Sequence, residues 1–132
     1  MKKILIIEDD VNVLHGLEAM FRVDGFEVLL DSGDFLIKDI IHKIKIKKPD
    51  YIILDLVLPK VDGFELLNFI KSDEDVFMIP IFVFSDMSDE DIRVRCHNLG
   101  ADYFFLKQDL NIQEFFSRVK KIIINRQKIH GK

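Results

Sequence analysis

Four apolar runs of this sequence are each followed directly by side chains that could bind a metal or act on phosphorus. These side chains are, in chain order, Glu8, Asp9 and Asp10, then Asp55, then Ser85, and finally Lys107. Clustered carboxylates repel one another in a partly desolvated site, and a hard divalent cation with octahedral oxygen ligands relieves that repulsion. If the four run ends converge, the acids are predicted to bind magnesium.

Asp55 could carry out covalent chemistry beside such a metal. A carboxylate can attack phosphorus to form an aspartyl phosphate, while a cation and a lysine neutralise the phosphoryl oxygens and a hydroxyl donates to them. Asp55, Lys107 and Ser85 supply these groups. The alternative is that Asp55 and Ser85 cap the helices that follow them and that Lys107 is a solvated loop residue. Each alternative is ordinary for one residue, whereas the joint occurrence at three run ends favours the chemical interpretation.

The apolar runs themselves predict β-strands. They are mostly continuous rather than alternating, which is typical of strands buried on both faces of a parallel sheet. The runs cover residues 4–7, 26–30, 51–54, 81–84 and 103–106. Apolar residues between them recur at the three-and-four spacing of amphipathic helices. These helices are expected at about residues 13–24, 34–48, 63–72, 88–100 and 112–124.

Strand and helix repeated five times predict an α/β fold, a doubly wound five-stranded parallel sheet with five helices distributed over both faces. Ligands of such sheets bind beyond the carboxyl ends of the strands, at the point where the strand order reverses. The predicted fold therefore brings the polar side chains of the run ends to one edge.

Composition and charge restrict the class of protein. The 132 residues, 48% of them hydrophobic, suffice for one domain with its own core. The 19 basic and 23 acidic residues give a net charge of −4, which disfavours direct nucleic-acid binding. Cys96 is the single cysteine, and the apolar run at residues 4–7 is too short for a signal peptide or a membrane span. We expect a soluble cytoplasmic protein without a membrane partner, whose residues 125–132 form a frayed basic tail.

Over about residues 2–124 the chain resembles the receiver domain of bacterial two-component response regulators. The segment "ILIIEDD" resembles the family's first strand and acid pair, "PDYIILDLVLPKVDGFELL" its phosphoacceptor segment, and "GADYFFLKQ" its fifth strand with the terminal lysine. Asp55 and Ser85 are 30 positions apart, and Ser85 and Lys107 are 22 apart, as in the family pattern. The resemblance implies a receiver domain at residues 1–124 with the flavodoxin-like strand order 2-1-3-4-5.

The resemblance also implies a role for each matching residue. Asp55 matches the phosphoacceptor, Lys107 the phosphate-contacting lysine, and Ser85 and Phe104 the switch pair. The implied Mg²⁺ ligands are Glu8, Asp9, Asp55 and the backbone carbonyl of Val57, while Pro59 and Gly63 match the loop after the acceptor. Asp10 is expected to face away from the metal.

The implied function is phosphorelay signalling rather than enzyme catalysis on a separate substrate. A histidine kinase or phosphotransfer protein would donate phosphate to Asp55, and the modified domain would change its affinity for a downstream target. The face made by the fourth helix, fifth strand and fifth helix would bind that target or a second copy of the chain. The chain would be either a complete single-domain regulator or a fragment of a larger one.

Two positions depart from the family pattern. Asp86 stands where a small residue usually follows the switch hydroxyl, and Gln108 replaces the proline that usually follows the lysine through a cis bond. A cis bond before a non-proline residue costs about 2.5–4 kcal/mol, so we expect a trans bond here. Both departures keep open an alternative, a receiver-like module that docks without taking phosphate.

Two rival classes fit the residues less well. A flavin-binding module would need backbone donors for a phosphate after the first strand, where Glu8, Asp9 and Asp10 would repel it. A magnesium phosphatase with an aspartyl nucleophile would need an Asp-x-Asp pair at the end of that strand, which this segment lacks.

Overall fold

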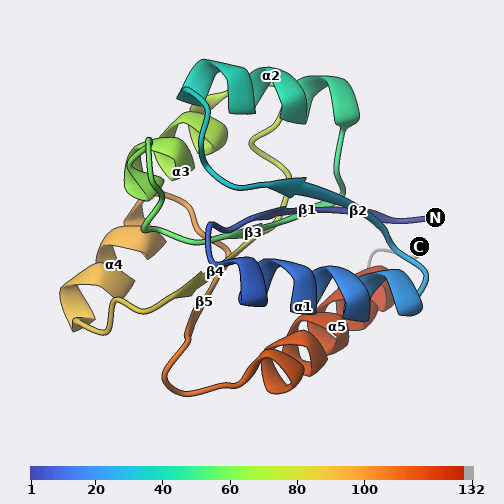
Figure 1. Ribbon diagram of the computed structural model, residues 1–132. Coiled ribbons are helices and arrows are strands. Elements are labelled where there is room, and N and C mark those ends of the chain that lie inside the picture. The colour runs from blue at the N-terminus through green and yellow to red at the C-terminus, as the bar shows by residue number, and fades with distance from the viewer. Residues whose placement is uncertain (130–132) are drawn as a thin grey trace.

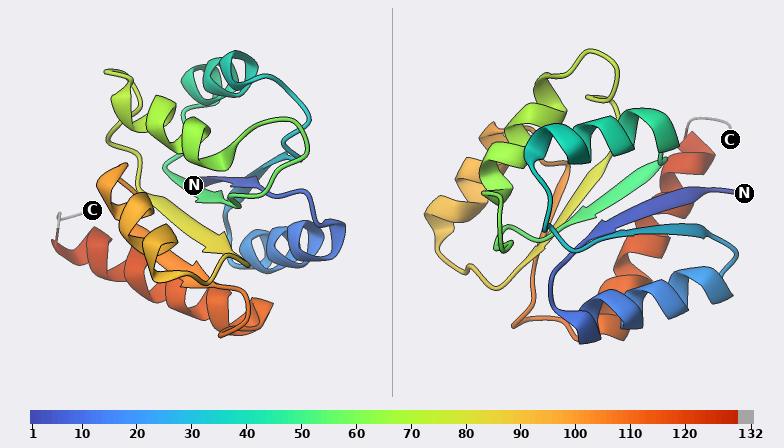
Figure 2. Two further views of the ribbon diagram at one scale, coloured as in Figure 1. Left: turned by 90° about the vertical axis from the view of Figure 1, so that its left-hand side faces the viewer. Right: turned by 45° about the horizontal axis from the view of Figure 1, so that its top comes forward.

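The computed structural model describes residues 1–129 and shows a five-stranded parallel sheet between two layers of helices (Figures 1 and 2). The strands are β1 (Lys3–Ile7), β2 (Glu27–Asp31), β3 (Tyr51–Leu54), β4 (Ile81–Ser85) and β5 (Tyr103–Leu106). The helices are α1 (Val11–Val23), α2 (Ile37–Lys47), α3 (Gly63–Ser72), α4 (Glu90–Asn98) and α5 (Ile112–Ile129). The strand order is β2-β1-β3-β4-β5, which confirms the predicted fold class and order.

The sheet is buried on both faces, and this explains why its inner strands are continuously apolar. Leu5 and Ile7 of β1 pack in a core with α2 and α3, whereas Ile4 and Ile6 pack in a second core with α1 and α5. All four of these side chains are fully buried. Figure 1 shows the same division, with α2 and α3 above the sheet and α1 and α5 below it.

Helix boundaries differ from the predicted ones at three places. Helix α2 begins at Ile37 rather than near Asp34, because a turn at Gly33 (φ +78°) precedes it. Helix α4 is shorter than residues 88–100 at both ends. Helix α5 continues to Ile129, so the prediction of a frayed tail from residue 125 was wrong for residues 125–129.

The extension of α5 has a visible cause. Arg126 donates a hydrogen bond of 3.2 Å to the hydroxyl of Tyr103 on β5, which fastens the last turns of the helix to the sheet. Arg126 and Lys128 also carry positive charge where the helix dipole favours it. Residues 130–132 of the predicted tail lie outside the described residues.

The peptide bonds of residues 1–129 include no cis bond, which confirms the trans bond predicted between Lys107 and Gln108. Within the same range, every helix is too short or too polar to cross a membrane.

Candidate functional site

The carboxyl ends of β1, β3, β4 and β5 bring the polar residues predicted from the sequence to one edge of the sheet. Glu8, Asp55 and Ser85 are buried there, Asp9 is exposed, and Lys107 is half-buried. The burial follows from the backbone, because the N–H of Asp55 bonds the carbonyl of Ile7 and the N–H of Lys107 bonds that of Ser85. The sheet's hydrogen bonding thus continues through the first residue after β1, β3 and β5, namely Glu8, Asp55 and Lys107.

Three carboxylates form an acidic pocket, which we define as Glu8, Asp9 and Asp55. One oxygen from each lies within 4.8 Å of the others, close enough to share one cation. All three donors are hard oxygen atoms, which suits magnesium. The acidic pocket therefore fits the cation expected from the sequence.

Asp10 caps helix α1 and is not a member of the acidic pocket. Its carboxylate caps α1 by accepting hydrogen bonds from the N–H groups of Asn12 (2.9 Å) and Val13 (3.3 Å). A side-chain oxygen at this position satisfies backbone donors that have no partner within the helix. The third acid of the run thus starts the helix and does not join the acidic pocket.

Lys107 reaches the acidic pocket although a trans bond and Gln108 follow it. Its Nζ lies 2.8 Å from Oε1 of Glu8 and 3.4 Å from Oδ2 of Asp55. Burial lowers the pKa of Lys107, but the hydrogen bond to Glu8 and the charges of Asp55 and Glu8 outweigh it and raise the pKa overall. Lys107 is therefore a permanent positive charge between the two buried carboxylates.

Glu8 has a strongly perturbed acidity. Burial raises its pKa to about 7; the hydrogen bond from Lys107 lowers the pKa, and the neighbouring charge of Asp55 raises it further. Because the ionised form is disfavoured in the folded protein, a bound cation would lower the cost of that ionisation.

The metal-free protein is predicted to lose stability between about pH 4.5 and pH 7 through Glu8. Its pKa is higher in the folded than in the unfolded state, so its contribution is fully present below its ordinary value of 4.5 and is lost as the pH rises through about 7. In EDTA, Glu8→Gln should be more stable than wild type above this range by on the order of 1–3 kcal/mol, with little difference at pH 4. Urea unfolding at several pH values measures this, and parallel pH profiles for the two proteins would contradict the assignment.

Ser85 and Asp55 do not cap helices, so the structural alternative for these residues was wrong. Ser85 Oγ accepts a hydrogen bond of 3.1 Å from the N–H of Met87, and Asp55 Oδ1 accepts one of 3.3 Å from the N–H of Val57. Helix α3 is instead capped by Asp62, and α4 begins after Asp89. Because Ser85 accepts from the backbone, its own hydroxyl hydrogen remains available to a ligand.

The loop after Asp55 is closed tightly. The N–H of Gly63 bonds the carbonyl of Leu56 at 3.1 Å, and Val57 and Asp62 form an isolated antiparallel bridge. A Cβ atom at position 63 would overlap the backbone of Leu56, so only glycine fits. This closure explains why a glycine stands in the loop after Asp55.

Asp86 directly follows Ser85, whereas Phe104 lies on β5 and packs against the core shared with α2 and α3. Asp86 is exposed, and its charge is the smallest of the influences that raise the pKa of Lys107. Phe104 is half-buried, and the Arg93 guanidinium lies 5.0 Å from the centre of its ring. The sequence pattern gave no signal for the contact with Arg93, because it joins α4 to β5.

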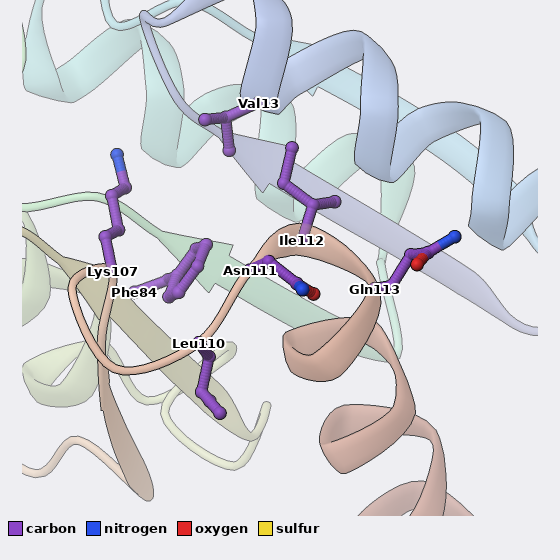
Figure 3. A pocket seen from close by; sticks show the side chains of 7 residues that line it. All are labelled: Val13, Phe84, Lys107, Leu110, Asn111, Ile112 and Gln113. Atoms are coloured by element: carbon purple, nitrogen blue, oxygen red, sulfur yellow. The ribbon is translucent and has the colours of Figure 1, made fainter.

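A hollow of about 500 Å³ adjoins the site through Lys107. Figure 3 shows its lining from α1, β4, the segment between β5 and α5, and the start of α5, namely Val13, Phe84, Lys107, Leu110, Asn111, Ile112 and Gln113. Most of the lining is apolar, and Lys107 is its one charged side chain.

Fold and site together define a class of protein, a doubly wound α/β domain with an acidic pocket and a lysine at the carboxyl ends of its strands. The model of the response regulator receiver domain family matches residues 4–120. The chain therefore belongs to this family of two-component systems, whose members are signalling modules rather than ordinary enzymes.

Individual relatives agree with the family assignment. The chain is 35% identical over 120 residues to the transcriptional regulatory protein KdpE of Staphylococcus aureus, covering 91% of this chain and 49% of that protein. It is 30% identical over 122 residues to the alkaline phosphatase synthesis transcriptional regulatory protein PhoP of Bacillus subtilis, covering 92% of this chain and 48% of PhoP. The chain thus spans about half the length of these relatives.

Among solved structures, the fold is similar to that of a two-component response regulator from Clostridium difficile. The TM-score is 0.78 at 27% identity, and the match covers 93% of this chain and 96% of that one.

Proposed function

We propose that this domain accepts a phosphoryl group on Asp55 from a histidine kinase or phosphotransfer protein and then changes its affinity for a target protein. The observation that carries the proposal is the convergence of buried Asp55 with two further carboxylates and the Nζ of Lys107. In the transfer, a carboxylate oxygen of Asp55 forms a bond to phosphorus while the bond from phosphorus to the donor's imidazole nitrogen breaks.

Glu8, Asp9, Asp55 and the backbone carbonyl of Val57 would hold magnesium. When bound, the ion supplies positive charge to the phosphoryl oxygens. Lys107 can move its ammonium from Glu8 and Asp55 to an incoming phosphoryl oxygen, because both contacts are made by the end of a flexible side chain. Ser85 can donate its hydroxyl hydrogen to another oxygen of the same group.

Acetyl phosphate tests the proposal without a partner protein. The intact mass should rise by one phosphoryl group in the presence of magnesium, and EDTA should prevent the increase. A protein that stays unmodified with magnesium, acetyl phosphate and a panel of histidine kinases would instead be the docking module that Asp86 and Gln108 suggest. The position of Lys107 favours phosphorylation, because the lysine enters the acidic pocket without the family's proline.

Self-dephosphorylation is predicted to be slow. Val57 and Met87, two positions after Asp55 and Ser85, resemble the family positions that place the attacking water, and both side chains are apolar. Val57→Asn with Met87→Glu should shorten the half-life of the phosphorylated protein by about tenfold, because a polar side chain can orient water. Loss of the phosphorylated mass over time measures this.

The matched control for that variant is Val23→Asn with Met78→Glu, which changes two exposed apolar residues outside the site. Its half-life should equal that of wild type. A wild-type half-life no longer than that of the Val57→Asn, Met87→Glu variant would show that the apolar side chains at these two positions do not slow dephosphorylation.

The target-binding face is proposed to be α4, β5 and α5, since Ser85 and Phe104 resemble the switch pair that links phosphate to this face. A downstream protein or a second copy of the chain would bind there. Phosphorylation should change amide hydrogen exchange most in these elements, including the segment of Arg93 that covers Phe104. Changes confined to α2 and α3 would place the face elsewhere.

A further inference from the structure

Asp31 is a buried carboxylate that the proposed phosphoryl transfer does not use. It ends β2, next to β1, and its side chain is only 1% exposed. Its backbone carbonyl accepts a hydrogen bond of 3.0 Å from the N–H of Glu8, so it adjoins a member of the acidic pocket. Burying an acid is costly unless its oxygens are well bonded, and the partners of Asp31 therefore indicate what it does.

The first partner is the backbone of a turn. Asp31 Oδ1 accepts a hydrogen bond of 2.8 Å from the N–H of Gly33, and Gly33 adopts a φ of +78°. This local bond between an aspartate and the second residue after it is a common way of fixing a turn. The second partner is Lys43 of α2, whose Nζ lies 3.5 Å from Oδ2 of Asp31 and also donates to the carbonyl of Leu30.

The turn at Gly33 packs against Leu58, in the loop that follows Asp55. A Cβ atom at Gly33 would lie 2.9 Å from both Cβ and Cδ2 of Leu58, so the backbone of the turn rests directly on that side chain. Leu58 is the residue after Val57, whose carbonyl is the proposed fourth metal ligand. On its other side the loop is held by the bridge between Val57 and Asp62.

We propose that Asp31 is a positioning residue of the metal site, which acts by holding the turn at Gly33 against Leu58 and so fixes the backbone of Val57. This inference rests on the proposed function and adds to it a residue outside the acidic pocket. In this role Asp31 acts through Oδ1, which accepts the hydrogen bond from the N–H of Gly33. Lys43 balances the buried negative charge. An asparagine, which keeps an acceptor oxygen of the same reach, should therefore replace Asp31 in this role.

The experiment compares the magnesium affinity of wild type with that of Asp31 and Leu58 variants by calorimetric or NMR titration. Asp31→Ala should weaken magnesium binding by about tenfold. This is the lower end of the loss of affinity expected when a residue that orients a metal ligand is removed. Asp31→Asn should stay within about threefold of wild type, as a conservative variant that restores the acceptor. Leu58→Ala should weaken binding in the same way, and its loss should not add to that of Asp31→Ala in the double variant.

Lys71→Met is the control for loss of an ion pair far from the acidic pocket, with a largely buried lysine and an exposed aspartate. Lys71 lies 2.8 Å from Asp102, which in turn accepts from the N–H of Ile81 at the start of β4, the edge of the sheet opposite the acidic pocket. This variant should lose stability and keep the wild-type magnesium affinity.

Two results would overturn the positioning role. Unchanged magnesium affinity in Asp31→Ala would leave Asp31 with a purely structural role, and equal losses of affinity in Asp31→Ala and Asp31→Asn would assign the effect to charge.

A measurement without metal separates this inference from the proposed function. Amide exchange at Gly63, whose N–H closes the loop on Leu56, should accelerate in Asp31→Ala but not in Asp31→Asn or Lys71→Met. If wild type bound no magnesium, the proposed function would fail, and this exchange pattern alone would decide on Asp31.

Discussion

Asp55→Asn should take up no phosphoryl group from acetyl phosphate or from a histidine kinase. The amide has nearly the shape of the carboxylate but lacks the charge that makes an oxygen nucleophilic toward phosphorus. Asparagine can keep the hydrogen bond from the N–H of Val57, so the loop should retain its form. Intact mass spectrometry measures the loss of uptake, and peptide mapping of the wild-type protein should place the modification on Asp55.

Asp62→Asn is the matched control, because Asp62 lies in the same loop and caps α3 through the N–H of Phe64. Asparagine is as good a cap as aspartate, so this variant should fold and accept phosphate as wild type does. Phosphate found in Asp55→Asn, or uptake lost in Asp62→Asn, would show that the acceptor lies elsewhere or that the loop as a whole governs uptake.

The strands were predictable because each inner strand is buried on both faces and must therefore be apolar throughout. Ile4 to Ile7 contribute alternately to the two cores, so no polar residue interrupts them. The start of α2 was not predictable in the same way. The helix start depends on a turn fixed by Asp31 and Gly33. The spacing of apolar residues around Ile37 does not indicate that turn.

The acidic pocket was predictable for the same reason, since parallel strands end at one edge and bring Glu8 and Asp55 together, with Lys107 beside them. Asp31 stands at a strand end as well, but an aspartate after an edge strand has the same sequence pattern as a solvated loop acid. Its burial depends on Lys43 from α2 and on the seating of Gly33 against Leu58, both of which are tertiary contacts.

Glu8→Gln and Asp9→Asn should each weaken magnesium binding by at least about tenfold, whereas Asp10→Ala should leave it within about twofold. The carboxylates of Glu8 and Asp9 share the acidic pocket with Asp55, and each removed charge lowers the attraction for a divalent cation. The Asp10 carboxylate is engaged at the start of α1, so its loss should cost about 1 kcal/mol of stability instead. The chain has no tryptophan, so calorimetry or NMR titration is the suitable measurement.

Stability and affinity should change independently in Glu8→Gln and Asp10→Ala, which separates a metal ligand from a structural acid. Without metal at neutral pH, Glu8→Gln should be more stable than wild type, because burial raises the pKa of Glu8 to about 7 and makes its ionisation costly. The same variant should gain less stability than wild type from the same concentration of magnesium, because stabilisation by a ligand rises with the logarithm of its concentration over Kd. Asp10→Ala should show the reverse, a less stable protein with the full gain from magnesium. Equal losses of affinity in all three variants would mean that the net charge of the segment, rather than the geometry of the acidic pocket, attracts the cation.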